Sequence, residues 1–180
     1  MFIVAKTAGF CFGVQNAIDK TLEATGKVVT FGEIIHNDLV VNKLKEKGIY
    51  PINSLSEYKD GRVIIRSHGV GKNIYDEMNK NGIEYIDATC PFVEKIHKIV
   101  RNAFDIGKQV IITGEASHVE VIGINGWCEN TAIIISDEDM ANKLDFIDKE
   151  CILVSQTTFS AEKFKNIEKI IKNKCKIVEI

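Results

Sequence analysis

Val63-Ile-Ile-Arg66 is typical of a β-strand. Ser67-His-Gly69 follows it directly, and a helical pattern comes next, near residues 72–81. This order of strand, loop and helix recurs along the chain. The strand-like run is almost continuously apolar instead of alternating, which is typical of a strand covered on both faces of a parallel sheet. Gln109-Val-Ile-Ile-Thr113 repeats this pattern. Because such strands alternate with helices along the chain, the sequence predicts the α/β class.

The alternation of strand and helix patterns continues through the whole sequence. Strands are predicted at residues 1–6, 28–31, 63–66, 84–86, 109–113, 131–135, 151–154 and 176–179, and helices near 38–47, 72–81, 92–106, 138–143 and 161–173. Glycines at 48, 82 and 107 each fall just past a helix, where a left-handed cap is favoured. We therefore expect repeated small parallel-sheet units: one lobe at residues 1–90, including the N-terminal strand, and a second at 91–180.

Composition restricts the classes of function. The 180 residues are 45% hydrophobic and 27% charged with a net charge of -2, as in globular proteins, so nothing favours nucleic acid or an anionic membrane as partner. The N-terminal apolar run is too short for a signal peptide, and no run is long enough to span a membrane. These features predict a cytoplasmic protein whose five cysteines are reduced, which favours metal or catalytic roles over disulfides.

Unusual polar residues follow nearly every predicted strand. In open parallel sheets, ligands bind beyond the carboxyl ends of the strands. His36, His68 and His118 all occupy such positions. Imidazoles beside helix N-termini suit a phosphate or diphosphate, although any one of them alone is more simply a cap or turn residue. His97 falls inside a helical pattern and is interpreted as structural.

Two further polar positions admit two interpretations each. Glu120, two residues after His118, is either a proton-carrying acid of the same cleft or a first-turn carboxylate that complements a helix dipole. Thr157 precedes a predicted helix, where its hydroxyl either contacts a ligand or caps the helix, and capping is the commoner role.

Cys11 and Cys90 both stand where a strand pattern gives way to a helix. A helix N-terminus favours the thiolate, which is the form that binds metal, so the two cysteines indicate a metal or iron–sulfur site. Such a cluster takes three or four protein ligands. Cys151 is interpreted as a buried residue of a strand, whereas Cys128 and Cys175 have no evident partner. The sequence contains no CxxC, GxGxxG or P-loop motif.

Six blocks of the chain resemble, in the same order, those of the 4-hydroxy-3-methylbut-2-enyl diphosphate reductase family: Ala8-Gly-Phe-Cys-Phe-Gly-Val14, Ile35-His-Asn37, Ser67-His-Gly-Val70, Asp87-Ala-Thr-Cys-Pro91, Ser117-His-Val-Glu120 and Ser155-Gln-Thr-Thr-Phe-Ser160. The resemblance implies a trefoil of three α/β lobes around a [4Fe–4S] cluster held by three cysteines, of which Cys11 and Cys90 match two. It also implies the last step of the methylerythritol phosphate route to isoprenoids.

The resemblance further implies the roles of five residues. His36, His68 and His118 match residues that hold the diphosphate of the allylic substrate, Glu120 matches the proton-delivering acid, and Thr157 matches a residue beside the substrate. Two electrons, from a donor such as ferredoxin or flavodoxin, and protons remove the hydroxyl as water. The products are isopentenyl and dimethylallyl diphosphate.

The chain departs from the family pattern at its end. Family members continue into a third α/β lobe with a third cluster cysteine in an Ile-Cys-x-Ala-Thr-like block, and the surroundings of Cys175 do not match that block. We therefore expect two of three lobes, in a fragment, a truncated gene product or a deliberately shortened chain. Two alternatives are a non-enzymatic diphosphate-binding remnant without a cluster, and a cysteine hydrolase that uses Cys90 with one of the histidines. The hydrolase alternative leaves Cys11 without a role.

Overall fold

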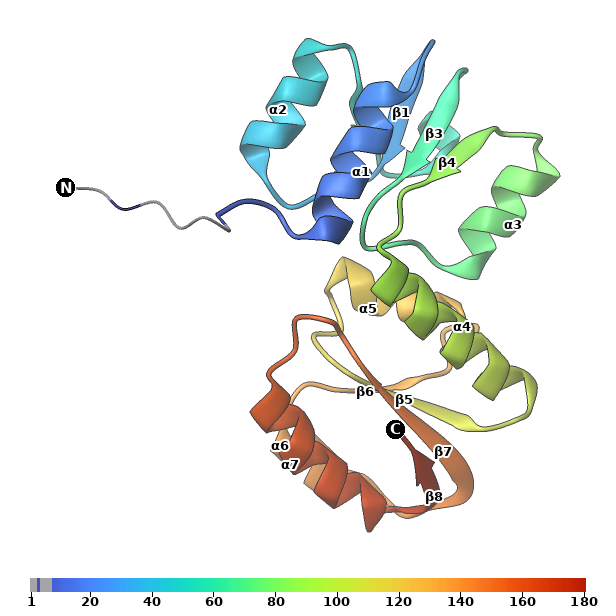
Figure 1. The fold of residues 1–180 in the computed structure, drawn as a ribbon. Helices are drawn as coiled ribbons and strands as arrows, with labels where there is room; N and C mark the ends of the chain where they lie inside the picture. Colours follow the sequence, from blue (N-terminus) through green and yellow to red (C-terminus); the bar gives the residue numbers. More distant parts are fainter. Residues whose placement is uncertain (1–2, 4–7) are drawn as a thin grey trace. The chain divides into compact units, whose positions relative to one another are not determined.

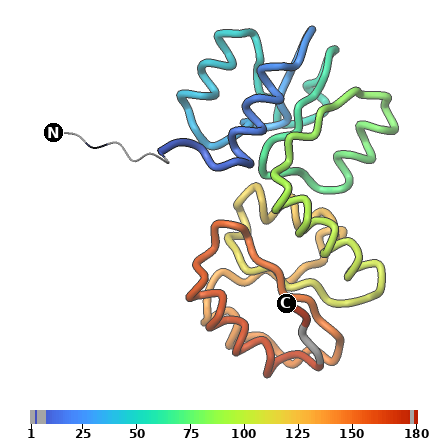
Figure 2. The backbone as a smooth tube through the Cα atoms, viewed as in Figure 1, coloured from blue at the N-terminus to red at the C-terminus, as the bar shows by residue number. Residues whose placement is uncertain are grey.

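The computed structural model describes residue 3 and residues 8–180, and the strand predicted at residues 1–6 falls, apart from residue 3, outside the described part. The chain forms two compact units (Figure 1, Figure 2). The first unit contains the residues up to Gly69 together with Met78–Pro91, and the second contains Val70–Glu77 together with Phe92–Ile180. The predicted lobe boundary at residue 90 and the third lobe stay predictions.

The first unit is built on a four-stranded parallel sheet. Its strands lie in the order β2 (Tyr50–Ile52), β1 (Val28–Phe31), β3 (Arg62–Ile65) and β4 (Tyr85–Asp87). The helices in this part of the chain are α1 (Phe12–Glu23), α2 (Asp38–Glu46), a 3-10 turn at Leu55–Glu57 and α3 (Lys72–Lys80), whose residues divide between the two units.

Both faces of this sheet are covered. Ile64 of the central strand β3 packs with Ala17 of α1 and Leu44 of α2 in one hydrophobic cluster. Val63 and Ile65 alternate with Ile64 along the strand and therefore face the opposite side, yet they are also fully buried. A strand buried on both sides explains why the Val63–Ile65 run is continuously apolar.

The second unit repeats the same topology. Its sheet has the order β6 (Ile133–Ile135), β5 (Gln109–Thr113), β7 (Ile147–Ser155) and β8 (Cys175–Glu179), again all parallel. The helices are α4 (Pro91–Asp105), α5 (Val119–Gly126), α6 (Glu138–Lys143) and α7 (Ala161–Lys172). In each sheet the second strand in sequence is an edge strand beside the first, so the units share one strand order.

Each face of the second sheet has its own core. Val110 and Ile112 of β5 pack on the side of α4 and α5, with Val100 and Ile124. Ile111, the residue between them, packs on the side of α6 and α7, in a cluster whose buried members include Ile135, Leu153, Ile167 and Ile171. Successive residues of one strand therefore serve two separate cores, as the period of two requires.

The sequence predicted this architecture well. The α/β class with repeated parallel sheets is confirmed. The predicted left-handed caps at Gly48, Gly82 and Gly107 are also confirmed, with φ values of 79°, 65° and 80°. Strand β2 was not predicted, because three residues that include Pro51 carry almost no pattern. Since β2 pairs only with β1, it tolerates the missing N–H of that proline at an edge.

The interpretation of Cys151 as a buried strand residue is confirmed, and the burial has a consequence for pH dependence. Cys151 is inaccessible to solvent, and burial together with a hydrogen bond to Cys175 raises the pKa of its thiol from 9.0 to about 12. The raised pKa stabilises the fold below the unfolded value near 9.0, and this contribution is lost as the pH rises toward about 12. We expect the free energy of unfolding, measured by urea titration, to fall over this range.

The matched control for this prediction is Cys151→Ala, which removes the titrating group. The difference in unfolding free energy between the two proteins should shrink as the pH rises above about 9.0. A difference that stays constant across that range would show that Cys151 is not the group responsible.

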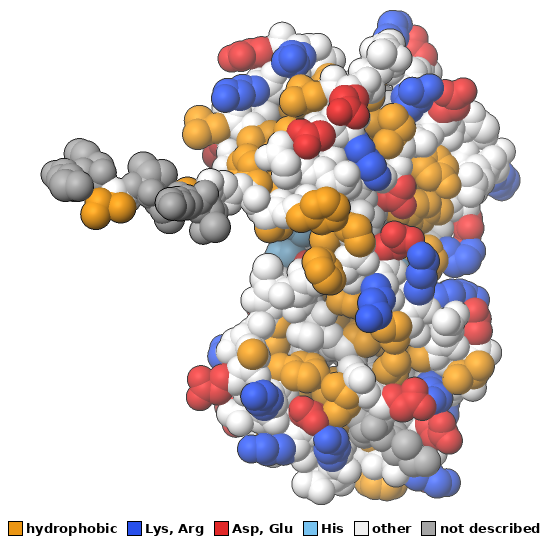
Figure 3. Space-filling model, in the orientation of Figure 1, with side chains coloured by type: hydrophobic (Ala, Val, Ile, Leu, Met, Phe, Trp, Pro, Cys, Tyr) orange, Lys and Arg blue, Asp and Glu red, His pale blue; other side chains and the backbone are white. Residues whose placement is uncertain are grey.

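Charged side chains of both signs are interspersed over the face of the molecule in Figure 3. This mixture agrees with the small net charge of -2. Among the described residues, none of the helices combines the length and the apolar character needed to cross a bilayer.

Candidate functional site

The first unit places Cys11 and Cys90 at two helix starts. Cys11 is the N-cap residue of α1, and its exposed side chain makes no capping hydrogen bond. Cys90 directly precedes α4 and is half-buried, and its backbone N–H donates to the carbonyl of Ser67 at 2.9 Å. Neither cysteine forms a disulfide. Both thiols therefore stand at helix N-termini, where the backbone contributes partial positive charge.

Gly13 brings the start of α1 against Cys90. A Cβ atom on Gly13 would lie 2.5 Å from Sγ and 3.0 Å from Cβ of Cys90, much closer than van der Waals contact permits. Since Cys11 is only two residues before Gly13, this contact draws both cysteines to the same edge of the first unit. The glycine is required for the close approach of the two segments, and its helical backbone needs no positive φ.

Replacement of Gly13 by alanine is expected to displace the Cys90 thiol from its position. Overpacking of this kind costs about 1–3 kcal/mol of unfolding free energy, partly offset by the better helix propensity of alanine. Urea unfolding should detect the loss, and mass spectrometry should detect an altered rate of Cys90 alkylation.

A double-mutant cycle with Cys90→Ala supplies the control for Gly13→Ala. Without Sγ in the way, the same substitution should cost measurably less. An equal cost in both backgrounds would mean that the contact with the thiol does not set the size of residue 13.

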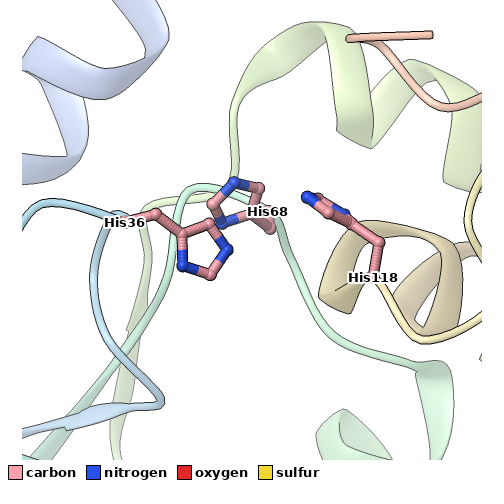
Figure 4. Close-up of side chains that lie close together, drawn as sticks. All are labelled: His36, His68 and His118. Carbon is pink, nitrogen blue, oxygen red and sulfur yellow. The ribbon is translucent and has the colours of Figure 1, made fainter.

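The first unit also brings together two of the predicted histidines. His36 lies in the loop after β1 and His68 in the turn after β3, and their ring centroids are 4.7 Å apart (Figure 4). His36 is exposed, with Glu33 Oε2 4.0 Å from its Nδ1, whereas His68 is half-buried. Two adjacent imidazoles offer two N–H donors to one anion, which suits a phosphoryl group.

Ser67 connects the segments that carry these residues. Its N–H and its Oγ both donate to the carbonyl of Ile34, at 3.2 and 3.1 Å, and its own carbonyl accepts from Cys90. Ser67 is buried. The end of β3 is thereby bonded on one side to the loop of His36 and on the other to the segment of Cys90, so the fold fixes both positions.

In the second unit, His118 caps α5. Its Nδ1 accepts a hydrogen bond from the backbone N–H of Glu120 at 3.1 Å, which confirms the cap that the sequence allowed for such a histidine. An Nδ1 atom that accepts places the ring proton of the neutral imidazole on Nε2.

Glu120 is a buried carboxylate held by one partner residue. It is 1% exposed, its Oε1 accepts the backbone N–H of Thr157 at 2.6 Å, and its Oε2 accepts the hydroxyl of Thr157 at 2.9 Å. Glu120 also lies in the first turn of α5, so the interpretation as a dipole-complementing residue agrees with the structure. Burial and two fixed donors are more than dipole complementation requires, and the role of Glu120 as a proton-carrying acid stays a prediction.

Thr157 does not cap the following helix. Ser160 is the N-cap of α7 and accepts from the N–H of Lys163, so the capping alternative for Thr157 is wrong. Both donors of Thr157 are directed at Glu120 instead. His97, the histidine interpreted as structural, is buried and stacks on Trp127 with ring centroids 5.2 Å apart.

The family model described as LytB protein matches residues 2–180 of the chain. The chain belongs to the LytB protein family. Its similar relatives include 4-hydroxy-3-methylbut-2-enyl diphosphate reductases from Alkaliphilus oremlandii, 46% identical over 96% of this chain, and from Clostridium acetobutylicum, 45% identical over 94%. The chain spans 63% of the length of the first and 27% of the second.

Two solved structures resemble this LytB chain closely. The E-1-hydroxy-2-methyl-but-2-enyl-4-diphosphate reductase of Plasmodium falciparum has a TM-score of 0.86 and 32% identity, and the similarity covers 94% of this chain and 55% of that one. A second structure is titled (E)-4-hydroxy-3-methyl-but-2-enyl diphosphate reductase, the terminal enzyme of the non-mevalonate pathway. It has a TM-score of 0.76 and 36% identity, with 99% and 66% of the two chains covered.

Sequence reasoning missed three contributors to the site of this LytB chain. Gly13 allows the contact with Cys90, Ser67 bonds the two loops of the first unit, and the Thr157 backbone N–H holds Glu120. Each acts through residues more than twenty positions away, so no local pattern reveals it. The sequence feature that comes nearest to revealing one of these contacts is Gly13. A glycine in the helix expected after Cys11 requires a packing explanation.

Proposed function

We propose that the full-length protein, meaning this chain together with sequence equivalent to the remaining length of its relatives, is a 4-hydroxy-3-methylbut-2-enyl diphosphate reductase. It would convert the allylic diphosphate to isopentenyl and dimethylallyl diphosphate, the last step of the methylerythritol phosphate pathway. The observation that carries the proposal is the contact of the α1 start with Cys90, which brings two free cysteines to one edge of the first unit. The names of the relatives support the same reaction.

Cys11 and Cys90 would bind a [4Fe–4S] cluster. Their thiols are free and stand at helix starts, and the missing side chain of Gly13 lets the start of α1 approach Cys90 Sγ closely. When bound, the cluster supplies electrons and a Lewis-acidic iron for the hydroxyl oxygen of the substrate. Cys128, Cys151 and Cys175 are buried in the cores of the second unit and are unsuited as ligands. The third ligand would come from the third lobe.

His36, His68 and His118 would bind the diphosphate. The adjacent imidazoles of the first unit and the imidazole of His118 in the second would contact phosphoryl oxygens, as ring N–H groups commonly do. The N-terminus of α5, directly behind His118, adds the partial positive charge of a helix end. Because the proposed reaction leaves the diphosphate group unchanged, these contacts would hold the substrate throughout the reaction.

Glu120 would deliver protons, and Thr157 would orient its carboxyl group beside the substrate. The overall change takes two electrons and two protons: the C–O bond breaks, the hydroxyl departs as water, and one C–H bond forms at either end of the allyl group. The two possible positions of that C–H bond give the two isomeric products. A buried carboxyl fixed by the N–H and hydroxyl of Thr157 keeps one orientation for each proton transfer. The electrons would come from a donor protein such as ferredoxin or flavodoxin.

Anaerobic reconstitution with iron and sulfide tests this assignment. The full-length protein is expected to take up about four iron atoms per chain with the visible absorption of a cubane cluster. The 180-residue chain, with two available thiols, should not hold such a cluster in stoichiometric amount. A stable stoichiometric cubane in the 180-residue chain would contradict the role given to the third lobe.

A further inference from the structure

Arg66 is the one arginine of the three in this sequence that the described structure leaves without an acidic partner. Arg62 donates from Nη2 to Glu84 Oε2 at 3.1 Å, and Arg101 is paired with Asp105 and Glu129. Among the ion pairs of the described residues, none involves Arg66. Its cation is nevertheless partly buried, an arrangement that is costly unless an anion compensates it.

Within the first unit, Arg66 lies close to the two loops that carry His36 and His68. It directly follows β3, two residues before His68. Its guanidinium lies over Gly32, where a Cβ would overlap Nη1, and Gly32 begins the loop that carries His36. Its Nε is 3.5 Å from the carbonyl of Gly69, the residue after His68, in a long hydrogen bond. The side chain thus extends between the two loops at the carboxyl edge of the sheet.

We propose that Arg66 supplies a fixed positive charge for the diphosphate group at the edge formed by His36 and His68. The inference rests on the proposed function and deepens it. A guanidinium stays protonated at every pH a protein tolerates, so its charge does not depend on the state of the imidazoles. Desolvation alone lowers the pKa of Arg66, as expected for a cation with no carboxylate beside it. An incoming diphosphate would provide the missing counter-charge.

Isothermal titration calorimetry with inorganic pyrophosphate tests the proposal in the 180-residue chain. Arg66→Gln is expected to raise Kd about tenfold, as for a lost charge-assisted contact. Arg66→Lys keeps the charge and should stay close to wild type. Arg62→Gln, which removes a charge at the opposite end of the same strand, should change Kd less than about twofold. The affinity of wild type should also fall more steeply with added salt than that of Arg66→Gln.

The controls separate this inference from the proposed function. Thermal unfolding of each variant checks folding, and Arg66→Lys remains informative if Arg66→Gln does not fold. Wild-type affinity in Arg66→Gln, combined with weaker binding in His36→Ala and His68→Ala, would overturn the inference and leave the proposed function standing. Equal losses in Arg66→Lys and Arg66→Gln would overturn the charge role. Absence of pyrophosphate binding in wild type would overturn the inference and the diphosphate role of the histidines together.

Discussion

Replacing Glu120 by glutamine should lower reductase turnover of the full-length protein at least about 100-fold, the lower end of what a positioned general acid contributes. The substitution is nearly isosteric. The amide oxygen of glutamine can accept the Thr157 N–H, and the amide nitrogen can donate to the Thr157 hydroxyl, so the local structure should persist. What glutamine cannot do is release and regain a proton.

The assay for Glu120→Gln is anaerobic consumption of the allylic diphosphate with a chemical reductant. Iron content and pyrophosphate affinity should match wild type, which separates lost proton transfer from lost assembly. Thr157→Val provides a graded comparison, since it removes the donor to Oε2 and keeps the backbone donor to Oε1. If Glu120→Gln retained half of wild-type turnover, Glu120 would not be the acid.

Replacing either Cys11 or Cys90 by serine should abolish stoichiometric cluster binding in the full-length protein. A serine hydroxyl is a poor substitute for a thiolate toward iron, and each cysteine would supply one of three protein ligands. The measurement is iron and sulfide per chain after anaerobic reconstitution, followed by the visible absorption spectrum. Turnover should disappear together with the cluster.

Cys128→Ala and Cys175→Ala are the matched controls for the serine variants. Both cysteines are buried in hydrophobic clusters of the second unit. Their loss should lower stability through the missing sulfur without changing the iron per folded chain. Full iron content in both Cys11→Ser and Cys90→Ser would exclude the two residues as cluster ligands.

The fold was predictable where local pattern and tertiary environment agree. Val63–Ile65 and Gln109–Thr113 are central strands covered on both faces. Their continuously apolar sequences indicate this burial. The edge strand Tyr50–Ile52 was not predicted, because a strand at the edge of a sheet can be short and need not be continuously apolar. The first part of β7, Ile147–Glu150, is mostly exposed, so its sequence predicted a strand that begins only at Cys151.

The candidate site was predictable only in part. The rule that ligands bind at the carboxyl ends of parallel strands pointed to the histidines and to Glu120 without any structure. Pairwise contacts between distant segments were not accessible. The contact of Gly13 with Cys90 and the hydrogen bonds from Thr157 to Glu120 form only when the sheets have folded. For Thr157 the sequence favoured a different role, helix capping. The roles of Cys11, Cys90 and the three histidines stay predictions that the variants above test.

We propose reductive dehydroxylation as the reaction of the full-length protein, and the identity of its products distinguishes this reaction from hydrolysis. The full-length protein, reconstituted anaerobically, is incubated with (E)-4-hydroxy-3-methylbut-2-enyl diphosphate and a reductant, and the products are separated by chromatography. We predict isopentenyl and dimethylallyl diphosphate, with two electrons consumed per molecule and the diphosphate intact. Release of inorganic diphosphate without electron consumption, unaffected by removal of iron, would contradict the account and indicate a hydrolase.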